Sequence, residues 1–107
     1  MQAPLWQHAV DRGGDFSTVT LFGELDLSAD RDVKTLLASE LGRPGLTRLL
    51  VDMSAVTFID STVLGTLVYA HNVAHEAGRQ FTVSPSERVR RIVEITGLSY
   101  LFNTPDR

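Results

Sequence analysis

A serine stands where an apolar segment is expected to turn into a helix. Residues 51–62 read Val-Asp-Met-Ser-Ala-Val-Thr-Phe-Ile-Asp-Ser-Thr, an apolar run that ends in a carboxylate and two hydroxyl groups. If Asp60 precedes the helix, Ser61 lies in its first turn, where unpaired backbone N–H groups and the positive end of the helix dipole favour negative charge. A phosphate on Ser61 would be stabilised there, so a serine at this place can act as a switch.

The elements that must position Ser61 can be predicted from periodicity, turn residues and capping residues. Segments 5–10 and 16–22 favour strands, and the glycine-containing turn at 11–14 joins them in a hairpin. A helix capped by Ser28 and stopped at Gly42 follows, then an apolar strand at 48–51 and the Ser61 helix, which ends near Gly78. A strand at 80–83 precedes a last helix, which we expect to begin with Ser84 as N-cap, Pro85 in the first helical position and Glu87 completing a capping box.

A hairpin followed by alternating helices and strands predicts a single α/β domain over residues 1–107. Its sheet is mixed, with an N-terminal antiparallel hairpin and then parallel strands, and the helices pack mainly on one face. The carboxyl ends of the strands then share one edge, which is where open α/β sheets bind ligands. Glu24, Asp26 and Asp52 follow predicted strands, and Asp60 stands at the start of the next helix. Asp52 and Asp60 can equally be structural, as a turn residue and an N-cap. Asp26 can likewise be an exposed loop carboxylate, or the cap of the first helix in place of Ser28.

Composition excludes several classes of function. The chain of 107 residues is 43% hydrophobic and 21% charged, with a net charge of -3, so it offers no basic surface for nucleic acid. It has no cysteine, which excludes disulfides, thiolate metal sites and thiol catalysis. No apolar run reaches the length of a membrane span, and no basic segment followed by an apolar one stands at the N-terminus. We therefore expect a cytoplasmic protein that binds neither nucleic acid nor membrane.

A helical wheel divides the Ser61 helix into two faces. The face expected to join the core carries Val63, Leu64, Leu67, Ala70, His71 and Ala74. The opposite face, expected to be exposed, carries Ser61, Thr62, Gly65, Thr66, Tyr69, Asn72 and Glu76. This polar face is either an ordinary solvated surface or a docking surface. The aromatic side chain of Tyr69 favours docking, because aromatic residues are enriched in protein interfaces.

Residues 58–65 (Phe-Ile-Asp-Ser-Thr-Val-Leu-Gly), preceded by Val-Asp-Met-Ser at 51–54, resemble the phosphorylation motif of the STAS-domain anti-sigma factor antagonists. Two flanking stretches resemble the same family: Gly-Glu-Leu-Asp at 23–26, and Val-Glu-Ile-Thr-Gly-Leu at 93–98 with Leu-Phe at 101–102. The similarity covers almost the whole chain in the same order and spacing. Val63 stands where the family often has glycine, on the side of the helix expected to be buried.

The resemblance implies a partner-switching protein. The unphosphorylated form would bind an anti-sigma factor that is also a serine kinase and thereby release a sigma factor. The kinase would transfer the γ-phosphoryl group of ATP to Ser61, which ends binding, and a serine phosphatase would restore the active form. The chain would be a substrate without a cofactor and not an enzyme, and its partner surface would comprise Asp26, Asp60, Ser61, Thr62, Gly65, Thr66 and Tyr69.

Other functions remain open from the sequence. Carboxylates at strand ends also suit an aspartyl-phosphate receiver or a magnesium-dependent phosphohydrolase, but Lys34 is the only lysine and falls within a predicted helix. His71 and His75 have the spacing of a metal-binding pair, although a packed, hydrogen-bonded histidine explains His71 better. A STAS adaptor without phosphorylation, serving a transporter, a lipid-trafficking complex or a stress-signalling assembly, would have the same fold.

Overall fold

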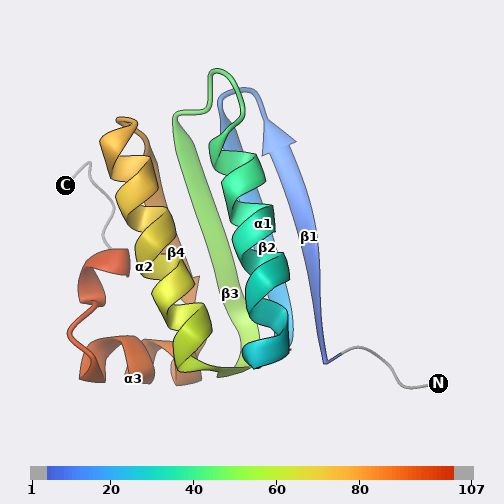
Figure 1. The fold of residues 1–107 in the computed structure, drawn as a ribbon, viewed down its shortest axis with the longest axis vertical. Coiled ribbons are helices and arrows are strands. Elements are labelled where there is room, and N and C mark those ends of the chain that lie inside the picture. Colours follow the sequence, from blue (N-terminus) through green and yellow to red (C-terminus); the bar gives the residue numbers. More distant parts are fainter. Residues whose placement is uncertain (1–4, 103–107) are drawn as a thin grey trace.

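Four strands form one mixed sheet in the computed structural model, which describes residues 5–102 (Figure 1). The sheet order follows the chain: β1 (Trp6–Gly13), β2 (Phe16–Leu25), β3 (Arg48–Ile59) and β4 (Gln80–Pro85). The hairpin β1–β2 is antiparallel, whereas β2–β3 and β3–β4 are parallel. The predicted fold class is confirmed.

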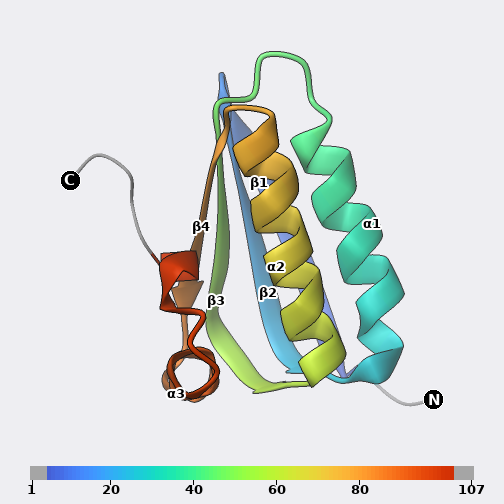
Figure 2. The same ribbon diagram turned by 60° about the vertical axis from the view of Figure 1, so that its left-hand side comes forward.

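Two long helices cover one face of this sheet. Figures 1 and 2 show α1 (Asp30–Leu41) and α2 (Ser61–Glu76) side by side on the same face, each entering from the end where its preceding strand finishes. A short 3₁₀ turn, η1 (Leu27–Ala29), leads into α1. Of the smaller elements, α3 (Glu87–Ile95) packs against β3 and β4, and η2 (Ser99–Phe102) packs against β4. Among the described residues, no helix is long and apolar enough to cross a membrane.

The core lies between the sheet and the two long helices. Strand residues alternate between this buried face and the outer face, as the pleat requires. The fully buried large apolar side chains include Val19, Leu21, Leu25, Val33, Leu37, Leu49, Val51, Met53, Val56, Leu67 and Leu101. Burying one such side chain contributes about 1.5–3 kcal/mol. The core therefore holds α2, and with it Ser61, in a fixed position on the sheet.

Strands β2 and β3 are longer than predicted, by three and eight residues at their carboxyl ends. Asp52 does accept hydrogen bonds from the backbone N–H and the hydroxyl of Ser54, at 3.0 and 2.8 Å, as a turn residue would. The strand nevertheless continues to Ile59, with shifts of register against β2 that absorb the irregularity. Asp52 is therefore not at a strand end, and the extra length brings the ends of β2 and β3 level.

The start of the last helix differs from the prediction. Ser86, not Ser84, is the N-cap of α3, and its hydroxyl accepts from the N–H of Val89 at 3.2 Å. Pro85 belongs to β4, where it is paired with Met53 of β3. The parallel pairing thus carries β4 two residues further than the local sequence indicates, and the second serine takes the capping role.

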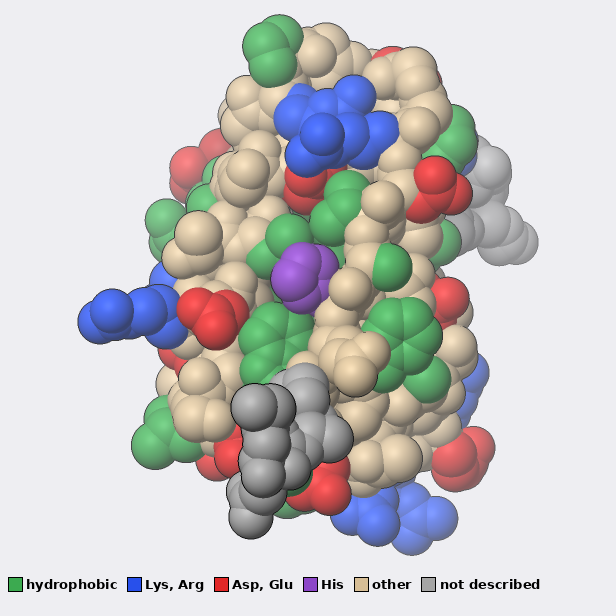
Figure 3. All heavy atoms as spheres, turned by 90° about the vertical axis from the view of Figure 1, so that its right-hand side faces the viewer, with side chains coloured by type: hydrophobic (Ala, Val, Ile, Leu, Met, Phe, Trp, Pro, Cys, Tyr) green, Lys and Arg blue, Asp and Glu red, His purple; other side chains and the backbone are tan. Residues whose placement is uncertain are grey.

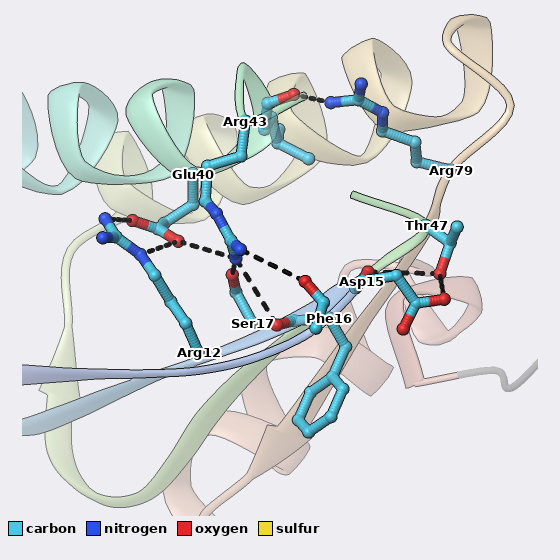
Figure 4. Close-up of polar contacts among 10 residues, drawn as sticks. Arg12, Asp15, Phe16, Ser17, Glu40, Arg43, Thr47 and Arg79 are labelled. Carbon is cyan, nitrogen blue, oxygen red and sulfur yellow. Dashed lines mark hydrogen bonds and ion pairs between the residues drawn. The ribbon is translucent and has the colours of Figure 1, made fainter. Parts of the chain in front are cut away.

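A buried carboxylate ties the other end of the molecule together. Glu40 of α1 is 1% exposed and accepts hydrogen bonds from Arg12 of β1, at 3.2 Å from Nε and 2.6 Å from Nη2 (Figure 4). Arg43 lies 3.9 Å from the same carboxylate and donates to the hydroxyl of buried Ser17 and to the carbonyl oxygen of Phe16. The hydrogen bonds from Arg12 lower the pKa of Glu40 below its ordinary value, although burial opposes this. This network anchors α1 on the hairpin, away from Ser61.

The surface on the β1 side carries charges of both signs. Figure 3 shows acidic and basic side chains interspersed over this face, with hydrophobic side chains between them. This face therefore has no extended patch of a single charge sign.

Candidate functional site

Asp60 connects β3 to α2 and organises the start of the helix. Its backbone is extended (φ −80°, ψ 150°), and its side chain accepts from the N–H of Thr62 at 2.8 Å. Its carbonyl oxygen accepts from the N–H of Leu64 at 3.1 Å. The predicted N-cap is confirmed, and Ser61 is consequently the first residue of α2, with an exposed side chain.

Asp26 follows the last residue of β2, as Asp60 follows the last residue of β3. Its carboxylate accepts from the backbone N–H and the hydroxyl of Ser28, at 3.1 and 2.6 Å, and so caps η1. Ser28 was expected to cap the following helix, and this is wrong, because α1 begins at Asp30 after Ala29, which makes no side-chain cap. The 3₁₀ turn shifts the capping role to Asp26.

The two capping aspartates follow neighbouring residues of the sheet. Leu25 and Ile59, the last residues of β2 and β3, are paired, and the N–H of Asp60 donates to the carbonyl oxygen of Leu25 at 2.9 Å. The structure therefore brings Asp26 and Asp60 together. The starts of α1 and α2, which these residues precede, lie at the lower end of the molecule in Figure 1. Glu24 pairs with Phe58 one step earlier. The predicted gathering of carboxylates at this edge is observed for Asp26, Asp60 and Glu24.

The outer surface of α2 continues from Ser61 along the helix. Ser61, Thr62, Gly65 and Tyr69 are all exposed, and Tyr69 retains 57% of its accessible surface. A Cβ added at Gly65 would meet no atom within 4 Å outside its own helix. Val63 is fully buried, as the wheel predicted. This part of α2 is an open strip of surface on which a partner has room to dock.

Thr66 does not belong to this exposed strip. It is 4% exposed, and its hydroxyl donates to a carboxylate oxygen of Asp30, the first residue of α1, at 2.5 Å. The wheel placed Thr66 at the margin of the polar face, and α1 covers that margin. The expectation of an exposed Thr66 is therefore wrong, and the residue links the two helices.

Two exposed apolar side chains near the site did not emerge from the sequence as candidates. Leu27, directly after Asp26, is 65% exposed, and Phe58, two residues before Asp60, is 41% exposed. A large aromatic residue in such a segment is expected to pack in the core or against the hairpin, and for Phe58 this expectation is wrong. The signal was present, because Phe58 adjoins buried Ile59 and neighbouring strand residues point to opposite faces.

His71 packs among aromatic rings but lacks the expected hydrogen bond at one nitrogen. Its ring centroid lies 4.8 Å from that of Tyr100, 6.2 Å from Phe81 and 6.4 Å from His75. Its Nδ1 is buried without a hydrogen-bond partner. Within residues 5–102, no three histidine or acidic side chains converge as metal ligands. The pair of histidines therefore lacks the further ligands that a metal centre requires.

Comparison with known proteins identifies the family. The family model of the STAS domain matches residues 8–106. The chain belongs to the STAS domain family. An anti-sigma-B factor antagonist from Listeria monocytogenes is 31% identical to this STAS domain over 90 residues, which make up 83% of the chain and 78% of the relative.

Solved structures share the fold. The unphosphorylated form of the anti-sigma factor antagonist SpoIIAA superposes with a TM-score of 0.76 at 21% identity, covering 94% of this STAS domain and 90% of that chain. The phosphorylated form of SpoIIAA, a Bacillus cell fate determinant, gives a TM-score of 0.71 at 20% identity, with 94% of each chain covered. An anti-sigma factor antagonist from Mycobacterium paratuberculosis gives 0.79 at 24% identity, covering 99% of this domain and 93% of that chain. The order and packing of the elements around Ser61 are thus those of the family.

Proposed function

We propose that this STAS domain is an anti-sigma factor antagonist that binds an anti-sigma factor serine kinase while Ser61 is unphosphorylated. Phosphorylation of Ser61 by that kinase ends the binding, and a serine phosphatase reverses it. The observation that carries this proposal is the exposed hydroxyl of Ser61 at the start of α2, beside an open strip of surface. Similarity to the Listeria antagonist supports the class of partner.

The proposed contact surface comprises Asp26, Asp60, Thr62, Gly65 and Tyr69 around Ser61. The first two residues are capping groups whose carboxylates remain partly accessible. The others are exposed on α2 and require no rearrangement to meet a partner. We leave Thr66 out of this surface, because only 4% of it is exposed.

Local charge explains how a phosphate would switch binding. A phosphoserine adds about −1.5 to −2 charge at neutral pH, and here it would stand beside the carboxylates of Asp60 and Asp26. A partner surface that accommodates the neutral hydroxyl would have to desolvate this anion without a cation to pair with it. Leaving a charge buried and unpaired costs several kcal/mol, and each ~1.4 kcal/mol is tenfold in affinity. The domain would not have to refold, because Ser61 is exposed and is not part of the core.

The proposal is tested by incubating the protein with candidate anti-sigma kinases and ATP, followed by intact-mass measurement and site mapping. We expect one phosphate, on Ser61, and none on Ser61→Ala. In binding measurements without ATP, Ser61→Ala should retain the affinity of the wild type, and Ser61→Asp should lose at least about tenfold. Ser99→Asp, which changes an exposed serine in η2, is the matched control and should bind normally.

Two results would contradict the proposal. One is phosphate on another residue with Ser61 left unmodified. The other is a Ser61→Asp variant that binds every candidate kinase as the wild type does. NMR shifts spread through the core on phosphorylation, instead of clustering near Ser61, would refute the local charge mechanism.

A further inference from the structure

A groove between the two long helices is lined mainly by apolar side chains. We call it the α1–α2 groove; Leu37, Ala38 and Leu41 of α1 line one side and Tyr69, Ala70 and Val73 of α2 the other. Its volume is about 170 Å³. A cavity of roughly 150 Å³ holds a benzene molecule, so this space fits one aliphatic or aromatic side chain.

The groove is aligned with Ser61. Ser61, Gly65, Tyr69 and Val73 follow one another at intervals of four residues and form one stripe along α2. Tyr69 is eight residues, or about 12 Å, further along the helix than Ser61. A partner that covers Ser61 and Gly65 therefore reaches the groove without crossing another element.

A cation stands at the mouth of the groove. Lys34 and Tyr69 line both the groove and a shallower hollow outside it, so they lie where it opens to solvent. Among residues 5–102, Lys34 takes part in no ion pair, and the ion pairs that are found join Arg12 and Arg43 to Glu40. An apolar hollow with an unpaired ammonium group at its mouth is complementary to an apolar side chain that has a carboxylate beside it.

We propose that the α1–α2 groove is a second docking point for the anti-sigma kinase, which inserts one apolar side chain and pairs a neighbouring carboxylate with Lys34. This inference rests on the proposed function and adds the chemistry of the partner. The contacts around Ser61 and the contacts in the groove are separate parts of one interface with the kinase. The groove contributes affinity that does not depend on the charge of residue 61.

The test uses the purified kinase that phosphorylates Ser61 in the assay above, and measures its dissociation constant by calorimetry without ATP. Ala38→Trp should close the groove, and Lys34→Glu should replace attraction by repulsion. Ala38 and Lys34 are exposed, so both variants should retain the melting temperature of the wild type within a few degrees. We expect each to weaken binding at least tenfold, whereas Lys34→Arg should stay within about threefold.

Two matched controls carry the same changes elsewhere. Arg31→Glu reverses an exposed cation of α1 that does not line the groove, and Ala9→Trp enlarges an exposed alanine on β1. Both should bind within about twofold of the wild type. Higher salt should reduce the difference between Lys34→Glu and the wild type, because it screens exposed charges.

The outcomes separate this inference from the proposed function. If Ser61→Asp loses binding while Ala38→Trp and Lys34→Glu bind normally, the groove proposal is overturned and the switch at Ser61 stands. If Arg31→Glu weakens binding as much as Lys34→Glu, the loss comes from the overall charge of α1 and not from a specific ion pair of Lys34 with the kinase. The groove proposal then also fails. If no candidate kinase binds the wild type, the proposed function fails and the groove loses its occupant.

Discussion

Replacing Gly65 by alanine should change stability and binding in opposite directions. Gly65 lies in the second turn of α2, one turn after Ser61, with an exposed surface. A Cβ built on it meets no atom within 4 Å outside its own helix, so the added methyl group creates no clash inside the domain. Its effect on the isolated protein is therefore the difference in helix propensity alone.

The size of the stability effect follows from that difference. Alanine is about 0.8–1 kcal/mol more favourable than glycine in a helix interior. In a domain of this size, that gain raises the melting temperature by roughly 4 °C or more. Thermal unfolding followed by circular dichroism measures the change.

Binding should weaken because the same methyl group points toward the partner. Extra atoms in a packed contact typically cost about 1–3 kcal/mol, which corresponds to about fivefold to 150-fold in the dissociation constant. Calorimetry with the kinase that modifies Ser61 gives this number. Asn72→Ala, further along α2, is the control, because it raises helix propensity without adding bulk.

Three results would refute this reasoning. If Gly65→Ala is more stable and binds as tightly as the wild type, no partner packs closely over Gly65, and the docking surface lies elsewhere. If Gly65→Ala is less stable, the space around Gly65 is not open. A loss of affinity in Asn72→Ala of the same size would attribute the effect to helix rigidity instead of contact.

Three further predictions concern the framework that holds the site. Gly23 has φ +92°, and a Cβ there would lie 2.3 Å from a backbone oxygen, so Gly23→Ala should lower the free energy of unfolding by about 1–2 kcal/mol for conformation and by about 1–3 kcal/mol for the clash. Gly14 has φ +61° and open space around it, so Gly14→Ala should show only the conformational loss. Urea unfolding measures both variants. Because the pKa of Glu40 is lowered in the folded protein, its carboxylate stabilises the fold above the ordinary pKa near 4.5. This stabilisation should be lost as the pH falls through the folded pKa. Glu40→Gln has no carboxylate at this position, so its stability should change less over the same pH range. Thr66→Val removes the hydrogen bond to Asp30 and should cost about 1 kcal/mol in urea unfolding.

Each of these has a result that contradicts it. Equal losses in the two glycine variants would mean that the β1 backbone moves away without cost. An acid unfolding profile that is the same with and without the Glu40 carboxylate would show that its ion pair does not contribute to stability. A Thr66→Val variant as stable as the wild type would show that the hydrogen bond to Asp30 does not contribute to stability.

Local patterns were enough to predict the elements and the cap of the central helix. The order of strands and helices follows from periodicity and turn residues, and the position of Asp60 before a run of helix-forming residues predicts its capping role. Both are properties of neighbours in the chain. The same applies to the exposed strip of Ser61, Gly65 and Tyr69, whose direction a helical wheel describes correctly.

Several of the features that the sequence did not predict are contacts between residues distant in the chain. Thr66 and Asp30 are 36 residues apart, and Arg12 and Glu40 are 28 apart, so no local pattern reports that they meet. A carboxylate on a helix is expected to face water, and only the approach of β1 allows Glu40 to be buried. At Ser84 and Ser86 the chain offers two equivalent caps, and pairing of β4 with β3 decides between them.

The capping role of Asp60 also bears on how the proposed switch works. Asp60 already satisfies the N–H of Thr62 with its side chain and that of Leu64 with its carbonyl oxygen, so α2 has a stable beginning without any phosphate. A phosphate on Ser61 would compete with a carboxylate for the positive end of the helix, and it would gain few bonds within the domain. It would therefore remain at the surface, where a partner must desolvate it and a phosphatase can reach it. For this reason we expect phosphorylation to change which protein binds, and to leave the fold unchanged.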